Sequence, residues 1–311
     1  MKSLSVVLTC YNEGYYIEEA VKSVLAQTRT DLIEKVVVVD DGSQQPTLDI
    51  LTRLQALDPR IEVCHGKGNG PAAGRNLGVK QCRSEWIAML DGDDLWLPEK
   101  IERQAKLAEQ HEEMGFVYTG LAYFSDEDPT PRVASVADLS NAKDLEVAYF
   151  LKDGPITSTA AVRRADFVKI GGYNESLRVF EDTDLYARLA AVTRFGFVKE
   201  PLTRKRLHAR SITSKRQVML AHQAYAATLI ATRVPRLIPL LPKRLSRAAR
   251  KLGNSEIADG NKQGAETMYR MAVAICPFSM IARLQLAALR LGLPLGTIRN
   301  WVVKRRRATP S

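Results

Sequence analysis

An apolar run ends in three carboxylates within Trp86-Ile87-Ala88-Met89-Leu90-Asp91-Gly92-Asp93-Asp94. The apolar part has the length and composition of a buried strand, and Pro98 indicates that a helix begins soon after it. Carboxylates this close raise one another's pKa unless a cation neutralises them. Mg²⁺ or Mn²⁺ can do so, and the same ion can bind the phosphate oxygens of a nucleotide. The stretch therefore predicts either a metal–diphosphate site at Asp91 and Asp93 or an acidic turn in which Asp94 caps the helix.

Strands and helices alternate around this stretch. Apolar, β-branched runs that indicate buried strands precede it at 4–9, 36–39 and 61–64. Apolar residues at helical spacing separate these runs, and this β-α-β-α alternation predicts an α/β fold with a doubly wound, mostly parallel sheet. Ligands of such sheets bind beyond the carboxyl ends of the strands. We therefore expect the polar strand ends at 9–13, 40–43 and 91–94 to converge on one cleft.

The rest of the chain divides into two parts. Further strands are expected at 115–124, 159–163 and 195–199, followed by an extended segment at 202–208. From about residue 215 the apolar spacing is helical to the end of the chain. The sequence therefore predicts an α/β domain over 1–214 and an all-helical C-terminal region over 215–311.

Charge is distributed unevenly between these parts. The whole chain carries a net charge of +10, and residues 215–311 hold 18 lysines and arginines against 3 acidic residues. A basic half favours an anionic partner, a membrane surface or a nucleic acid, although a solvated basic surface without a partner is an equal alternative. No helix-turn-helix, RNP or zinc-finger pattern is present, so nucleic acid is the less favoured partner.

Several other classes of protein are disfavoured. The cysteines at 10, 64, 82 and 276 are scattered without a CxxC pair, which predicts reduced thiols in a cytosolic protein rather than a zinc site. No secretory cleavage site follows Met1, and no apolar run reaches the roughly 18 residues of a membrane span. No G-x-G-x-x-G follows the first strand, which argues against an oxidoreductase on a dinucleotide fold.

Six short motifs occur in a specific order along the N-terminal part. They are Val6-Val7-Leu8-Thr9-Cys10-Tyr11-Asn12-Glu13, Val38-Val39-Asp40-Asp41-Gly42-Ser43, Gly74-Arg75-Asn76-Leu77-Gly78, Asp91-Gly92-Asp93-Asp94, Gly171-Gly172-Tyr173 and Glu181-Asp182-Thr183-Asp184. In this order they resemble the inverting family 2 glycosyltransferases of the GT-A, nucleotide-diphospho-sugar transferase fold. The resemblance covers about residues 3–214 and does not extend to the C-terminal helices.

The resemblance implies a metal-dependent, inverting transfer of a sugar. The donor would be a nucleotide-diphosphate sugar, with a UDP-sugar favoured, and the acceptor a hydroxyl group of a glycan or lipid-linked molecule. Such a reaction serves the synthesis of cell-surface polysaccharide or lipopolysaccharide. The alternative is a non-catalytic nucleotide-sugar-binding domain joined to helices that bind a nucleic acid or a membrane.

The resemblance also assigns nucleotide-binding residues. The positions matching those that hold the nucleobase and its ribose are Thr9, Tyr11, Glu13, Asp41 and Asp91. A tyrosine can stack on a base, and an aspartate can accept a base N–H group. Arg75 matches a basic residue that could neutralise the phosphates, although Gly74 stands where relatives carry alanine.

Metal and acceptor roles follow from the same resemblance. Asp93, in the Asp-x-Asp motif, and His208 match ligands of Mn²⁺ or Mg²⁺, which assists the departing diphosphate. Asp182 matches the general base that takes the proton of the acceptor hydroxyl, and neighbouring carboxylates would keep its pKa from falling too low. The residues matching the acceptor site are Gly172, Tyr173 and Glu181.

The basic segments suggest a membrane surface. Leucines and bases alternate over 233–251, and 304–307 is wholly basic. Each lysine or arginine near an anionic leaflet adds roughly 1 kcal/mol of attraction. The sequence therefore predicts a cytoplasmic protein that binds peripherally to the inner face of the cell membrane.

Overall fold

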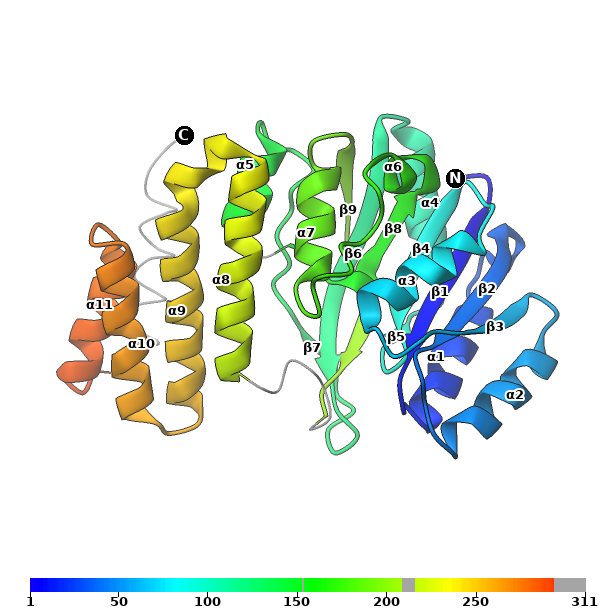
Figure 1. Ribbon diagram of the computed structural model, residues 1–311, viewed down its shortest axis with the longest axis horizontal. Coiled ribbons are helices and arrows are strands. Elements are labelled where there is room, and N and C mark those ends of the chain that lie inside the picture. The colour runs from blue at the N-terminus through cyan, green and yellow to red at the C-terminus, as the bar shows by residue number, and fades with distance from the viewer. Residues whose placement is uncertain (153, 209–215, 294–311) are drawn as a thin grey trace. The chain divides into compact units, whose positions relative to one another are not determined.

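The computed structural model describes residues 1–152, 154–208 and 216–293, without the side chains of 216–220 (Figure 1). The chain divides into two compact units, Met1–Ser214 and Lys215–Ser311. The first unit contains a nine-stranded mixed sheet covered by helices, and the described part of the second is built from helices. The predicted α/β class and the helical C-terminal region are confirmed.

The sheet of the first unit is parallel in its N-terminal half. Its strands are β1 (Leu4–Cys10), β2 (Ile33–Asp40), β3 (Ile61–His65), β4 (Trp86–Asp91), β5 (Leu95–Trp96), β6 (Met114–Phe124), β7 (Arg132–Val133), β8 (Ala160–Arg163) and β9 (Arg194–Arg206). Their order is β3-β2-β1-β4-β8-β6-β9-β5, with β7 paired to β6. The first four neighbours are parallel, whereas β8 is antiparallel to both β4 and β6.

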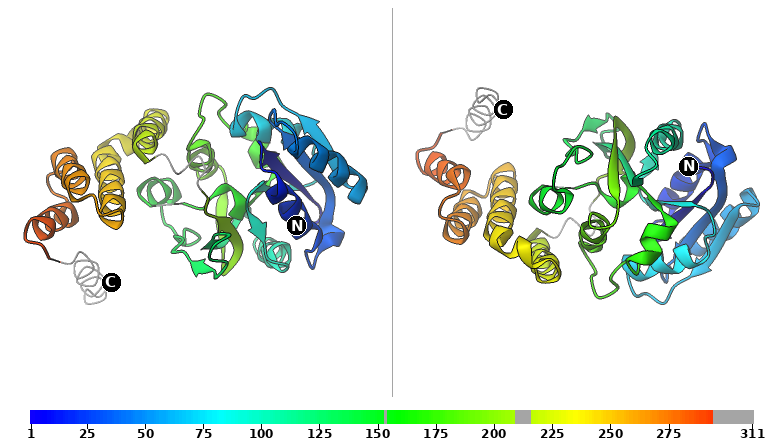
Figure 2. Two further views of the ribbon diagram at one scale, coloured as in Figure 1. Left: turned by 90° about the horizontal axis from the view of Figure 1, so that it is seen from below. Right: turned by 90° about the horizontal axis from the view of Figure 1, so that it is seen from above.

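Helices cover both faces of this sheet (Figures 1 and 2). They are α1 (Tyr15–Leu25), α2 (Thr47–Leu57), α3 (Pro71–Lys80), α4 (Lys100–Gln110), α5 (Leu145–Leu151), α6 (Arg164–Lys169) and α7 (Glu181–Leu189). Val6 and Val38 belong to a core shared with the apolar faces of α1, α2 and α4. Val7 faces α3 instead, so closely that a Cβ on Gly78 would lie 2.5 Å from its Cγ1. Burial on both sides explains why these strands are uninterrupted apolar runs.

Strand β9 brings the end of the first unit back to the acidic stretch Asp91–Asp94. The sequence predicts a strand at 195–199 and a separate extended segment at 202–208, but the two form one strand. It pairs parallel with β6 along both parts, across register shifts, and antiparallel with β5. Because β5 directly follows the acidic stretch, this pairing places the last residues of β9 beside it.

The described part of the second unit contains α8 (Arg216–Arg233), a 3₁₀ segment (Pro235–Leu240), α9 (Leu241–Ala258), α10 (Lys262–Ile275) and α11 (Met280–Arg290). In one of its apolar clusters, Ala249, Ala272 and Ala282 are buried together. None of the helices within the described residues is long and apolar enough to cross a membrane. The basic segment at 304–307 lies outside the described residues.

Candidate functional site

The ends of β1, β2 and β4 meet at one edge of the sheet. Thr9 pairs with Asp91 across β1 and β4, and Cys10 pairs with Asp40 across β1 and β2. Beyond the strands, the Gly92 N–H donates to the Thr9 carbonyl at 3.0 Å. The predicted convergence of the three polar strand ends is therefore confirmed.

Three carboxylates gather at the end of β4. One oxygen from each of Asp91, Asp93 and Asp94 lies within 4.8 Å of the others. Hard oxygen donors at this spacing suit a divalent cation. Glu13 faces the same place, since burial, followed by the charges of Asp93 and Asp91, raises its pKa to about 8. The cluster concentrates negative charge that a metal would offset.

The prediction that Asp94 caps the next helix is wrong. Strand β5 intervenes, and the residue before α4 is Glu99. Asp94 is fully buried, with Oδ2 accepting from the Ser158 hydroxyl at 2.6 Å and Oδ1 from the Arg206 N–H at 3.0 Å. Burial raises its pKa to about 7. Both oxygens are therefore used to fix the loop that carries Asp93.

His208 lies against Asp93. Its Nε2 is 2.9 Å from Asp93 Oδ2, and both side chains are largely buried. The imidazole is also packed against the Tyr16 ring, with the ring centroids 5.4 Å apart. The structure thus brings together the two residues that the sequence predicts as metal ligands, although they are 115 residues apart.

Arg75 joins the acidic stretch to the start of α7. Its Nη2 donates to Asp91 at 2.7 Å and its Nη1 to Glu181 at 2.6 Å. Burial alone would raise the pKa of Asp91, but the Arg75 guanidinium holds it below its ordinary value. The guanidinium also lies 5.3 Å from the centre of the Tyr173 ring. This buried cation therefore places α7 at the same cleft as the carboxylate cluster.

Asp182 lies in the first turn of α7, next to Glu181. Burial and then the Glu181 charge raise its pKa to about 7, although its Oδ1 accepts the Thr183 N–H at 2.6 Å. Phe180, the residue before the helix, has a φ of 62°, a left-handed conformation that non-glycine residues rarely adopt. A carboxylate that titrates near neutrality is suited to taking a proton.

The predicted nucleobase residues lie at the ends of β1 and β2. Asp41 accepts the Gly68 N–H at 3.0 Å and the Gly70 N–H at 2.6 Å, so its carboxylate holds the loop before α3. Tyr11 is 61% exposed, which leaves its ring face open. Thr9 is half-buried at the end of β1.

The predicted acceptor residues are tied to α3. Asn76 accepts the Tyr173 N–H and donates to the Tyr173 carbonyl, both at 2.9 Å. Gly172 has a φ of 70° and could carry no Cβ without approaching Asn76 Oδ1 to 2.7 Å. Tyr173 itself is only 3% exposed and contacts Arg75.

Two residues of the site are not identified from the sequence. Ser158 accepts the Asp91 N–H at 3.1 Å and donates to Asp94, but no local pattern marks it. Arg206 contacts the Asp93–Asp94 loop through its backbone and its side chain. Its only signal is its position two residues before His208.

Comparisons with known proteins agree on one family. The model of Glycosyl transferase family 2 matches residues 5–171. An uncharacterized glycosyltransferase of Rickettsia conorii is 29% identical over 204 residues, 66% of this chain and 33% of that protein. One of Methanocaldococcus jannaschii is 28% identical over 207 residues, 66% of this chain and 70% of that protein. The matched region thus spans about a third of the first of these relatives.

Solved structures share the fold at low sequence identity. TarS 1–349 of S. aureus in complex with UDP-GlcNAc has a TM-score of 0.64 and 17% identity, covering 94% of this chain and 92% of that one. The mannosyltransferase PcManGT of Pyrobaculum calidifontis, in complex with GDP-Man and Mn²⁺, has a TM-score of 0.62 and 18% identity, covering 96% and 83%. These similarities establish the arrangement of the elements.

Proposed function

Because this chain belongs to glycosyl transferase family 2, with the GT-A fold, we propose that it is an inverting, metal-dependent glycosyltransferase. It moves a sugar from a nucleotide-diphosphate sugar, with a UDP-sugar favoured, to a hydroxyl group of a glycan or lipid-linked acceptor. Residues 1–214 are the catalytic domain in this proposal, and 215–311 are an accessory basic region. The reaction would serve cell-surface polysaccharide or lipopolysaccharide synthesis.

The donor set fits Mn²⁺ or Mg²⁺. Asp93 and His208 would hold the ion, with Asp91 contributing to the ribose or the metal, since carboxylate oxygens and one imidazole suit these cations. When bound, the metal supplies Lewis-acid assistance to the departing diphosphate. Asp94 would not be a ligand, because both of its oxygens accept hydrogen bonds from the protein.

The nucleotide would lie along the ends of β1, β2 and β4. The exposed Tyr11 ring would stack on the base, with Thr9, Glu13 and Asp41 around it. The Nε of Arg75 is a buried donor without a hydrogen-bond partner among the described residues, which supports a contact with a phosphate oxygen. The complexes of TarS with UDP-GlcNAc and of PcManGT with GDP-Man support a nucleotide-sugar donor.

The general base in this proposal is Asp182. The observation that carries the assignment is the Arg75 bridge, which connects Asp91 at the donor side to Glu181, the neighbour of Asp182. A carboxylate with a pKa raised to about 7 can accept the proton of an acceptor hydroxyl and keep it during transfer. Glu181, Gly172 and Tyr173 would shape the acceptor side from behind this base.

Replacement of the base tests the activity. Asp182→Asn should bind UDP with Mn²⁺ as the wild type does, as measured by calorimetry, but transfer sugar about 10²–10⁴-fold more slowly. The matched control is Asp49→Asn on the exposed face of α2, which should transfer normally. Product configuration, read by NMR, should be inverted relative to the donor. Normal transfer by Asp182→Asn would refute the base assignment.

Nucleotide binding tests the donor class separately. A thermal-shift panel of nucleoside diphosphates, with and without Mn²⁺, should show stabilisation that depends on metal. A chain that responds to no nucleotide would contradict the proposed function and favour a binding role for the basic helices.

We further propose that the second unit binds the anionic inner face of the cell membrane. This proposal is supported by four exposed basic side chains and one exposed apolar side chain in the segment. They are Arg233, Arg236, Lys243, Lys251 and Ile238. Not every base of 233–251 contributes, since Arg244 is buried. Flotation with vesicles containing anionic lipid at low salt should recover the protein, and no recovery would refute the surface. Binding of duplex DNA instead would favour a nucleic-acid partner.

A further inference from the structure

Arg206 lies outside the ligand set but holds the loop that carries it. It is the last residue of β9 and is only 4% exposed. Its backbone N–H donates to Asp94 Oδ1 at 3.0 Å, and its side-chain Nε donates to the Asp93 carbonyl at 3.1 Å. One residue therefore fixes both the side chain of Asp94 and the backbone of Asp93.

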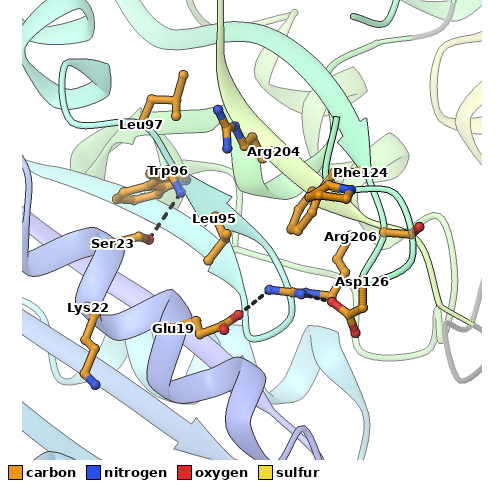
Figure 3. A pocket seen from close by; sticks show the side chains of 12 residues that line it. Glu19, Lys22, Ser23, Leu95, Trp96, Leu97, Phe124, Asp126, Arg204 and Arg206 are labelled. Carbon is orange, nitrogen blue, oxygen red and sulfur yellow. Dashed lines mark hydrogen bonds and ion pairs between the residues drawn. The ribbon is translucent and has the colours of Figure 1, made fainter. Parts of the chain in front are cut away.

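The guanidinium then extends away from the cluster to two other segments. Figure 3 shows it between Glu19 of α1 and Asp126 of the loop after β6, each of which forms an ion pair with one amino group. The rings of Tyr16 and Phe124 lie 4.3 Å and 4.6 Å from its central carbon, within range of a cation–π contact. Arg206 is thus held by two carboxylates and two aromatic rings.

The same group of contacts reaches His208. The Tyr16 hydroxyl donates to Asp126 at 2.5 Å, and the Tyr16 ring packs against the imidazole. Since His208 follows Arg206 by two residues, the direction of the chain at Arg206 also sets where the imidazole meets Asp93. The orientation of both proposed metal ligands therefore depends on this arginine.

We propose that Arg206 is a positioning residue for the metal site, a role that rests on the proposed function. It fastens the Asp93–Asp94 loop and the His208 segment to α1 and to the loop after β6, so that carboxylate and imidazole are in place before the metal arrives. Glu19 and Asp126 are half exposed, so their ion pairs contribute little to global stability. Their effect is on orientation, and variants should fold.

Direct metal binding tests the role. Arg206→Gln should bind Mn²⁺ about 10-fold more weakly in the presence of UDP, the effect typical of losing a group that orients a metal ligand. Calorimetry should show unchanged binding of UDP without metal. The pH profile of transfer should keep its shape, because Asp182 is untouched.

The matched control is Arg204→Gln. Arg204 and Arg206 belong to the same strand and both line a groove of about 540 Å³ (Figure 3). Within the described residues, the Arg204 side chain makes no hydrogen bond or ion pair. This variant should bind Mn²⁺ as the wild type does. The double variant Glu19→Gln/Asp126→Asn, which leaves Arg206 in place, should weaken Mn²⁺ binding in the same direction by a smaller factor.

Two results would overturn the inference. One is wild-type Mn²⁺ affinity in Arg206→Gln, and the other is an equal loss in Arg204→Gln. Hydrogen exchange without metal separates this role from the proposed function: the amides of 92–96 should exchange faster in Arg206→Gln than in the wild type. If wild type binds no Mn²⁺, the proposed function fails, and unchanged exchange would then remove the positioning role as well.

Discussion

Replacing Arg75 by glutamine should destabilise the first unit strongly. Arg75 is 4% exposed and makes two ion pairs, at 2.7 Å to Asp91 and 2.6 Å to Glu181. Removing one partner of a buried charge pair costs about 3–5 kcal/mol, because Glu181 then stays buried without its cation and Asp91 keeps only the nearby charge of Lys205. At about 2–4 °C for each kcal/mol, the melting temperature should fall by roughly 6–20 °C.

The loss should depend on pH. In the wild type the Arg75 guanidinium opposes the effect of burial and holds the pKa of Asp91 low, so this pair contributes stability above the pKa of an unfolded aspartate. In Arg75→Gln the guanidinium is gone, so burial raises the pKa of Asp91 in the folded state. The loss of stability is therefore greatest at a pH high enough to keep Asp91 charged. The difference in melting temperature should therefore be large at pH 8 and smaller near pH 5.

Differential scanning calorimetry at both pH values provides the assay. The matched control is Arg29→Gln, because Arg29 and Asp31 form a single ion pair at 2.8 Å with both side chains exposed. Such a pair contributes little to stability. An equal loss in both variants, or a loss in Arg75→Gln that is the same at pH 5 and pH 8, would refute the reasoning.

Three further predictions concern the proposed general base, Asp182, and the buried core of the first unit. Burial and the Glu181 charge raise the pKa of Asp182 to about 7, so initial rates should rise about tenfold for each pH unit below 7 and level off above it; a flat profile would exclude this base. Lys100 is fully buried, and its Nζ donates to Gln104 Oε1 at 2.8 Å, so Lys100→Met leaves a buried acceptor unpaired and should cost about 1–3 kcal/mol in urea unfolding at pH 10. The cost should shrink toward pH 7, because burial lowers the pKa of the folded lysine and so weakens wild-type folding wherever the unfolded lysine is charged. Gly78→Ala would place a Cβ 2.5 Å from Val7 Cγ1 and should cost about 1–3 kcal/mol by the same measurement, with an unchanged midpoint contradicting the close approach of α3.

The parallel half of the sheet is predictable from local pattern. Val36 to Val39 are fully buried, as an uninterrupted β-branched run indicates, and β4 occupies the predicted position. Burial on both faces needs apolar residues at every position, so composition alone marks these strands. Because the polar residues follow the carboxyl ends of these parallel strands, the sequence also predicts that they meet in one cleft.

The later strands are not predictable in the same way. Strand β9 contains Lys199-Glu200-Pro201, which interrupts the apolar run and suggests two separate segments. The strand continues because β6 pairs with it on both sides of this interruption. Pairing between distant segments leaves no local signal.

The residues of the site also divide into those that a local sequence pattern predicts and those that depend on distant contacts. Asp91, Asp93 and Asp182 are predicted from short motifs, each of which lies within a few consecutive residues. Asp94 has the sequence of a helix cap, but its partners Ser158 and Arg206 lie 64 and 112 residues away. Contacts over such separations decide its role, and the sequence cannot display them.

The pairing of β5 has a consequence for the order in which the protein acquires its structure. Strand β5, directly after the acidic loop, pairs only with β9 within the described sheet, and His208 lies two residues beyond β9. Contacts of high sequence separation form late, because a long loop must close before they are made. During synthesis the proposed nucleotide end of the cleft can therefore form while the chain is still growing, whereas the proposed metal site must wait until residue 208 has left the ribosome. Nascent chains that end before β9 should bind a nucleotide, if at all, without dependence on Mn²⁺.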